Sequence, residues 1–180
     1  MGAVLHAGAV SNLFHGRAGR RLDLNNSATA VFVDVLFLAV STLAREPWHF
    51  RFASLLTLQD QSVMGRGVVG FDLDDLDWGA TPAERAAAKE FVLDVVDLAL
   101  DRHRWDELSY EPARAEGYLR EFRAMVREFD PQEADPAAAV PGPGNRMPAV
   151  HEAACASCVR HRVLDGLPWW GGCVFCTAGG

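Results

Sequence analysis

The sequence predicts a mainly α-helical protein with short β segments (α+β), built as a helical body followed by a small C-terminal knuckle or ribbon. Three observations predict this fold class. Amphipathic segments with helix-start signals fill residues 27–129, five of the nine prolines fall within residues 130–150, and all four cysteines follow that stretch. We therefore expect a helical body over residues 1–129, a proline-rich linker over residues 130–150 and a metal-binding tail over residues 151–180.

The first two helices are expected early in the body. Residues 1–26 are rich in Gly and Ala and end in a polar pair, which predicts a strand or extended segment and then a turn. Ser27 is a suitable N-cap for a helix that runs to about Glu46. Pro47 then stands at the first position of a second helix, whose amphipathic pattern continues to about Gln61.

The third and fourth helices complete the body. Thr81, Pro82 and Glu84 form a capping-box pattern, so a helix is expected to begin there and to run to about His103. The fourth helix is expected over residues 112–129. Each helix carries a charged stripe at helical spacing, and we expect the acidic stripe to face the basic one: Glu90, Asp94, Asp97 and Asp101 on the third helix, Arg120, Arg123 and Arg127 on the fourth.

Composition and charge narrow the classes of function. The chain is 49% hydrophobic and carries a net charge of −7, which describes a globular protein and disfavours generic binding to nucleic acid or to anionic membranes. A basic protein partner is favoured instead. Sixteen of the 17 cationic residues are Arg, which is typical of a GC-rich bacterial genome, and no secretion signal opens the chain. The sequence thus indicates a cytoplasmic bacterial protein.

One apolar run resembles a membrane span. Residues 28–44 are shorter than the ~20 residues that cross a bilayer, and they contain Asp34 near the middle, where a charge is costly. This run is therefore interpreted as a buried core helix, and no membrane association is expected.

The acidic stretch VVGFDLDDLDWG offers an alternative function. It resembles the strand end at which haloacid-dehalogenase-type phosphatases present an aspartyl nucleophile, with Asp72 and Asp74 in the matching positions. That resemblance implies a metal-dependent hydrolase that uses Asp72, Asp74 and Asp75. Downstream, the alternating strands and the second acidic pair of that family do not follow, so the segment is more simply a solvated acidic loop. A nearby G-x-G-x-x-G match lacks the strand and helix that a dinucleotide site requires.

The cysteines form the strongest pattern in the chain. Cys155 and Cys158 make one C-x2-C pair, and Cys173 and Cys176 make the other. Two such pairs can complete a tetrahedral zinc site in a small zinc knuckle or ribbon, and a closed set of four ligands indicates a structural role. His161 provides an alternative fourth ligand in place of Cys155. Iron remains an alternative metal, since thiolates at this spacing serve both.

Four residues between the cysteine pairs are candidates for an interface: Arg160, Arg162, Trp169 and Trp170. Arginine beside aromatic residues can anchor a protein interface or stack on nucleic-acid bases. The simpler interpretation is that the tryptophans cover the metal core or dock the tail on the body.

Taken together, the patterns predict a non-enzymatic protein-binding or adaptor protein with a structural zinc site, of which a toxin-neutralising immunity protein would be one type. Two alternatives stay open at this stage. One is the metal-dependent hydrolase acting through Asp72, Asp74 and Asp75, and the other is a nucleic-acid-binding regulator acting through the tail.

Overall fold

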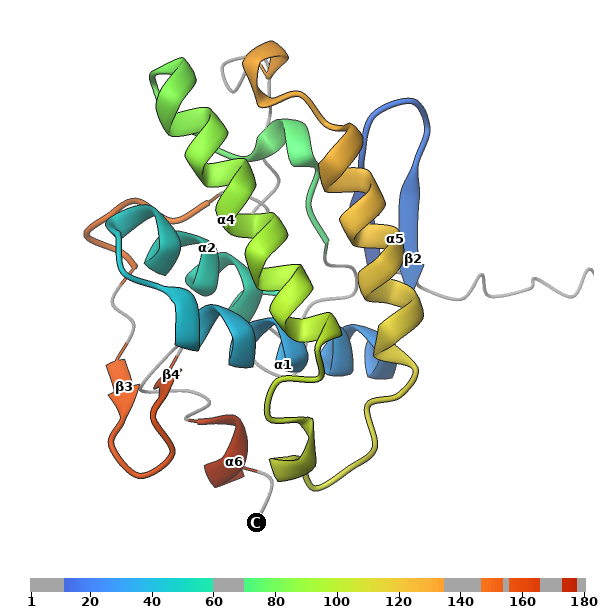
Figure 1. The fold of residues 1–180 in the computed structure, drawn as a ribbon, viewed down its shortest axis with the longest axis vertical. Coiled ribbons are helices and arrows are strands. Elements are labelled where there is room, and N and C mark those ends of the chain that lie inside the picture. The colour runs from blue at the N-terminus through green and yellow to red at the C-terminus, as the bar shows by residue number, and fades with distance from the viewer. Residues whose placement is uncertain (1–11, 60–69, 135–146, 154–155, 166–172, 178–180) are drawn as a thin grey trace, which may run out of the picture.

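The computed structural model describes residues 12–59, 70–134, 147–153, 156–165 and 173–177. It confirms the predicted fold class, with a helical body and two small antiparallel strand pairs, one of them in the C-terminal tail (Figure 1). The helices are α1 (Asn26–Leu43), α2 (Pro47–Thr57), α4 (Pro82–Leu100), α5 (Ala115–Glu128) and the short α6 (Val174–Thr177). Helix α1 lies across the molecule, and α4 and α5 pack against it and against each other.

The N-terminal strand prediction is confirmed as a hairpin. Strands β1 (Asn12–His15) and β2 (Arg21–Leu24) pair antiparallel, with Phe14 opposite Leu22. Phe14 is fully buried, and its ring meets Phe32 of α1 edge-on at 5.4 Å between centroids. The hairpin therefore covers one end of the helical core through its alternating apolar side chains.

Helix α1 begins and ends earlier than predicted. Its N-cap is Asn25, whose side chain accepts a hydrogen bond from the Ala28 N–H, so the prediction of Ser27 as the cap is wrong. Both are good N-cap types, and the choice depends on a contact across the fold: Asn12 of β1 donates to the Thr29 hydroxyl at 2.8 Å. The helix ends at Leu43 because Ala44 is extended.

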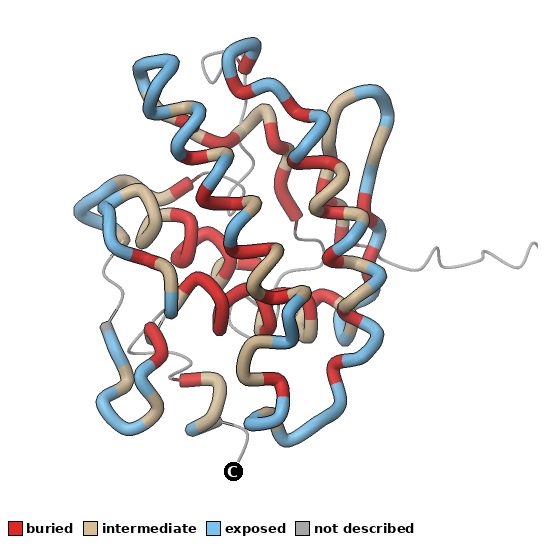
Figure 2. The backbone as a smooth tube through the Cα atoms, viewed as in Figure 1, coloured by how far each residue is buried: buried red, intermediate tan, exposed pale blue. Residues whose placement is uncertain are grey.

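By length and composition α1 could span a membrane, a test that the core helix of a soluble protein also passes. Its middle turns are buried against the other helices, as the continuous red stretch of the tube shows (Figure 2). Its Asp34 is partly buried and accepts a hydrogen bond from the Tyr110 hydroxyl at 2.6 Å. These contacts agree with the expected core helix.

The other helix starts follow their capping signals. Pro47 opens α2, and Thr81 caps α4 in a capping box with Glu84, as predicted. The predicted ends were too late: α2 stops at Thr57 and α4 at Leu100. Beyond α4, Arg102 and Arg104 have φ of 59° and 60°, which a right-handed helix cannot contain.

The charged stripes of α4 and α5 meet at one pair. Arg123 of α5 donates from both Nε and Nη2 to the carboxylate of Asp97 on α4. Arg120 instead pairs with Glu116 within α5 at 2.9 Å. Helix α5 starts at Ala115 rather than at residue 112, because the turn that follows Pro112 precedes it.

The C-terminal tail packs on the body. Strands β3 (Ala156–Cys158) and β4 (Val163–Asp165) form a hairpin below α1, and α6 lies beside it (Figure 1). Val163 is buried against Leu38 of α1, and the Leu164 N–H donates to the Ser41 hydroxyl of α1 at 3.1 Å. Met147, in the predicted linker, is also buried, whereas residues 135–146 of that linker lie outside the described residues.

Candidate metal centre

Two short turns bring the ligand residues of the tail together. Cys158 ends β3, and the Arg162 N–H donates to the Cys158 carbonyl at 2.7 Å, which closes a turn that contains His161. Arg162 has φ of 55°, so the chain reverses sharply there before β4. At the start of α6, the Cys176 N–H donates to the Cys173 carbonyl at 2.9 Å. Each turn presents two side chains, three positions apart, to the same point.

The donor atoms have the spacing of a four-coordinate site. The Nδ1 atom of His161 lies 3.5 Å from Sγ of Cys173, 3.5 Å from Sγ of Cys176 and 3.7 Å from Sγ of Cys158. The Sγ atoms of Cys158 and Cys176 are 4.0 Å apart, and all four donors lie within 4.8 Å of one another. A tetrahedral ion with metal–sulfur bonds of ~2.3 Å and metal–nitrogen bonds of ~2.0 Å requires separations of about 3.8 Å between sulfurs and about 3.5 Å from sulfur to nitrogen. This group could therefore hold a metal ion.

The body supplies the surroundings of the centre. Cys173 is buried and packs with Leu38 and Val163. Arg104, in the loop after α4, donates to the His161 carbonyl at 3.0 Å, and its guanidinium lies 4.8 Å from the centre of the Phe175 ring. These contacts fix the turn that carries His161, so the donor set is oriented by the helical body as well as by the tail.

The cysteine pKa values differ within the centre. The backbone N–H of His161 lowers the pKa of the Cys158 thiol, whereas burial raises the pKa of Cys173 to about 11. Because the thiolate is the form that binds a metal, an incoming ion must displace the proton of Cys173. Metal affinity should therefore fall as the pH is lowered.

The predicted site residues are only partly described. The structure brings Cys158, His161, Cys173 and Cys176 together, whereas Cys155, Trp169 and Trp170 lie outside the described residues. Arg160 and Arg162 are exposed on the hairpin turn. Sequence reasoning missed Arg104, because its contact with His161 joins residues 57 positions apart and no local pattern signals it.

The acidic segment has structural partners. Asp72 caps the short 3-10 helix η1 (Leu73–Asp75) by accepting from the Asp74 N–H, and Asp74 pairs with Arg17 at 2.7 Å. Asp77 pairs with Arg51 at 2.9 Å. Among the described residues, the tail group is the one cluster of Cys, His, Asp and Glu donors close enough to share an ion. The hydrolase alternative therefore lacks a gathered set of carboxylates in this part of the chain.

Asp75 in the acidic segment is expected to make the free energy of unfolding depend on pH. Burial, and then the charges of Asp72 and Asp74, raise the pKa of Asp75 above its ordinary value of 3.8. The folded state thus disfavours the ionised form, and this penalty grows as the pH rises from about 3.8 through the raised pKa. We expect Asp75→Asn to be more stable than the native protein at pH 7, with a smaller gain at pH 4, in urea unfolding at both values.

A matched control for this variant is Asp94→Asn, at an exposed position on α4. It should show no comparable difference between the two pH values. An Asp75→Asn protein that loses stability at pH 7 would show that the carboxylate is stabilising instead.

Comparison with known proteins identifies no relative of this chain. No family model, curated protein or solved structure matches it. The metal centre and the net charge of −7 are therefore the features of the molecule that bear on its function.

Proposed function

We propose that this chain is a non-enzymatic protein-binding or adaptor protein of the bacterial cytoplasm, whose tail is held on the helical body by a structural zinc ion. The observation that carries the proposal is the near-equal distance from the His161 Nδ1 atom to three cysteine Sγ atoms, 3.5 to 3.7 Å. Three thiolates and one imidazole are a common structural zinc set. With all four positions filled by protein, no coordination site is left for a substrate.

The location of the centre supports a structural role. The centre joins the β3–β4 hairpin and the short helix α6 to α1 and to the loop after α4. The hairpin and α6 bury little apolar surface of their own. Small units of this kind gain folding free energy from the metal, on the order of 10 kcal/mol. Zinc is favoured over iron because a mononuclear Cys3His set is typical of structural zinc.

The partner is proposed from the charge of the chain. A net charge of −7 favours a basic protein over nucleic acid, and an immunity protein that neutralises a basic toxin would have this character. Exposed Arg160 and Arg162 carry the opposite charge to the rest of the chain, so the tail would contribute to such an interface only opposite acidic groups of the partner.

Native mass spectrometry tests the proposal most directly, on full-length protein purified from its own host without chelators. We expect one zinc per chain and a stoichiometric basic protein partner, whose complex weakens as salt is raised. Protein that binds no zinc would contradict the structural site. Zinc with a second divalent ion, and phosphatase activity that disappears in Asp72→Asn and Asp74→Asn, would favour the hydrolase instead.

A further inference from the structure

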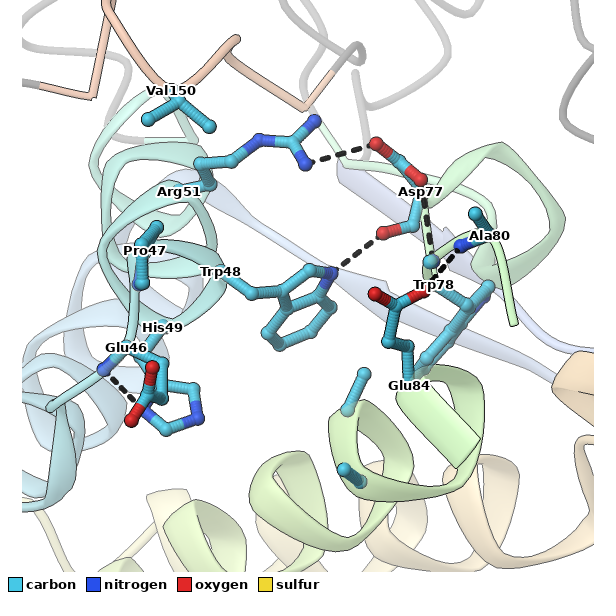
Figure 3. Close-up of a pocket in the computed structure, with 13 residues that line it drawn as sticks. Glu46, Pro47, Trp48, His49, Arg51, Asp77, Trp78, Ala80, Glu84 and Val150 are labelled. Carbon is cyan, nitrogen blue, oxygen red and sulfur yellow. Dashed lines mark hydrogen bonds and ion pairs between the residues drawn. The ribbon is translucent and has the colours of Figure 1, made fainter. Parts of the chain in front are cut away.

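A cavity lies away from the metal centre, between the start of α2, residues 77–80 and the first turns of α4. Its volume is about 500 Å³, within the range of about 300–1,000 Å³ that is typical of ligand sites. Trp48 stands in the middle of it, with Glu46 and His49 on one side and Asp77 and Glu84 on the other (Figure 3).

The apolar part of this cavity is centred on Trp48, which neighbouring groups hold in place. The Trp48 indole N–H donates to the Asp77 carbonyl at 2.6 Å, and its ring stacks on Phe52 with centroids 5.6 Å apart and planes 11° apart. Opposite, Ala87 and Ala88 of α4 carry small side chains that leave room beside the indole. The ring also lies near the rings of Trp78 and Phe91, with centroids 6.1 and 6.2 Å away, so the cavity offers a ligand the part of the indole that these neighbours leave uncovered.

The charged groups of the cavity are mostly acidic. Among the described lining residues there are three carboxylates and one guanidinium, that of Arg51, which is already engaged by Asp77 at 2.9 Å and by the Pro148 carbonyl at 2.5 Å. Burial lowers the pKa of His49, so its imidazole is neutral at pH 7. The cavity is therefore electronegative.

Glu84 has one oxygen to offer a ligand. Its Oε2 atom accepts from the Ala80 and Thr81 N–H groups at 3.0 and 2.9 Å, and its other oxygen is turned toward Trp48 (Figure 3). Hydrogen bonds from Thr81 lower the pKa of Glu84, so it is ionised. The same bonds use N–H groups at the start of α4 that could otherwise attract an anion.

We infer that this cavity binds the cationic side chain of a lysine or arginine from a protein partner, with the cation between the Trp48 ring and the Glu84 carboxylate. A cation is attracted by an aromatic face, and a nearby carboxylate adds a charge-assisted hydrogen bond. Val150, 63% exposed at the rim, offers apolar contact to the chain that carries the cation. The identity of the partner as a basic protein rests on the proposed function.

The test is an NMR titration of the full-length protein with blocked Gly-Gly-Arg-Gly-Gly and Gly-Gly-Lys-Gly-Gly peptides, following the Trp48 indole N–H. The same peptide with citrulline at the central position is the neutral control, and the same peptide with Glu there is the anionic control. Free arginine amide represents a small cation without the flanking chain. We expect a cationic peptide to bind, more tightly than arginine amide because its backbone reaches Val150, and neither control peptide to bind comparably.

Two variants test whether the Glu84 carboxylate is responsible for the binding. Glu84→Gln keeps an oxygen for the capping box and removes the charge, so the affinity should fall roughly tenfold. Glu90→Gln makes the same change at an exposed position of α4 that does not line the cavity, and it should leave the affinity unchanged. The inference would be overturned if both variants lost affinity equally, or if the citrulline or Glu peptide bound as well as the cationic ones. It would also be overturned if arginine amide bound more tightly than the peptides, or if no cation bound.

Zinc content measured on the same sample separates the two proposals. Protein that contains zinc and binds no cationic peptide contradicts the inference alone. Protein that binds the peptide through Glu84 and contains no zinc contradicts the structural zinc site alone.

Discussion

Cys173→Ser is expected to bind no zinc at the proposed site and to release the tail from the body. Cys173 is 1% exposed and contributes both a ligand and a buried contact with Leu38 and Val163. Changes outside the first ligand shell already lower metal affinity about 10–100-fold, so loss of a ligand should lower it by at least about 100-fold. Metal analysis would measure the loss of zinc.

Hydrogen exchange would report the release of the tail. In the native protein the Leu164 N–H donates to the Ser41 hydroxyl at 3.1 Å, and it should lose its protection in Cys173→Ser. The amides of α4, which belong to the body, should keep theirs, because no ligand of the centre lies on that helix.

Matched variants identify the fourth ligand. His161→Ala should lose zinc as Cys173→Ser does, because the Nδ1 atom lies within 3.7 Å of all three described sulfurs. Cys155→Ser, the same chemical change outside the described residues, should keep it. The reverse result, with zinc lost in Cys155→Ser and kept in His161→Ala, would replace the proposed set by the four cysteines.

Gly70→Ala is expected to destabilise the body by at least about 4 kcal/mol. Gly70 has φ of +125°, a backbone conformation that L side chains rarely adopt, and a Cβ atom there would lie 1.7 Å from the Leu13 carbonyl oxygen. The strand edge cannot easily move away, because the His15 N–H donates to the Phe71 carbonyl at 3.0 Å beside it. Urea unfolding would measure the change in the free energy of unfolding.

The control is the same substitution in a helix. Gly117 lies exposed in α5, and a Cβ atom there would meet nothing within 4 Å. Gly117→Ala should therefore stabilise the protein by about 0.5–1 kcal/mol, since alanine loses less conformational entropy in a helix. If Gly70→Ala were as stable as Gly117→Ala, the close approach of residues 13 and 70 would be wrong.

Features that depend only on neighbouring residues could be predicted from the sequence. Pro47 and the Thr81–Glu84 capping box start their helices as predicted, because caps satisfy N–H groups within one turn of the chain. The two-residue spacing of Cys173 and Cys176 likewise predicted that both would face one point, since a single turn sets that geometry. These features need no distant partner.

Features that depend on contacts between residues far apart in the chain could not be predicted and are seen in the folded protein alone. Asn25 replaces Ser27 as the cap of α1, at the end where Asn12 of the hairpin reaches Thr29. His161 lies among the sulfurs in a turn that Arg104 holds from the body. The cavity around Trp48 likewise joins segments about 30 to 100 residues apart. Local spacing carries no information about such pairs, because the packing of the whole core sets their distances.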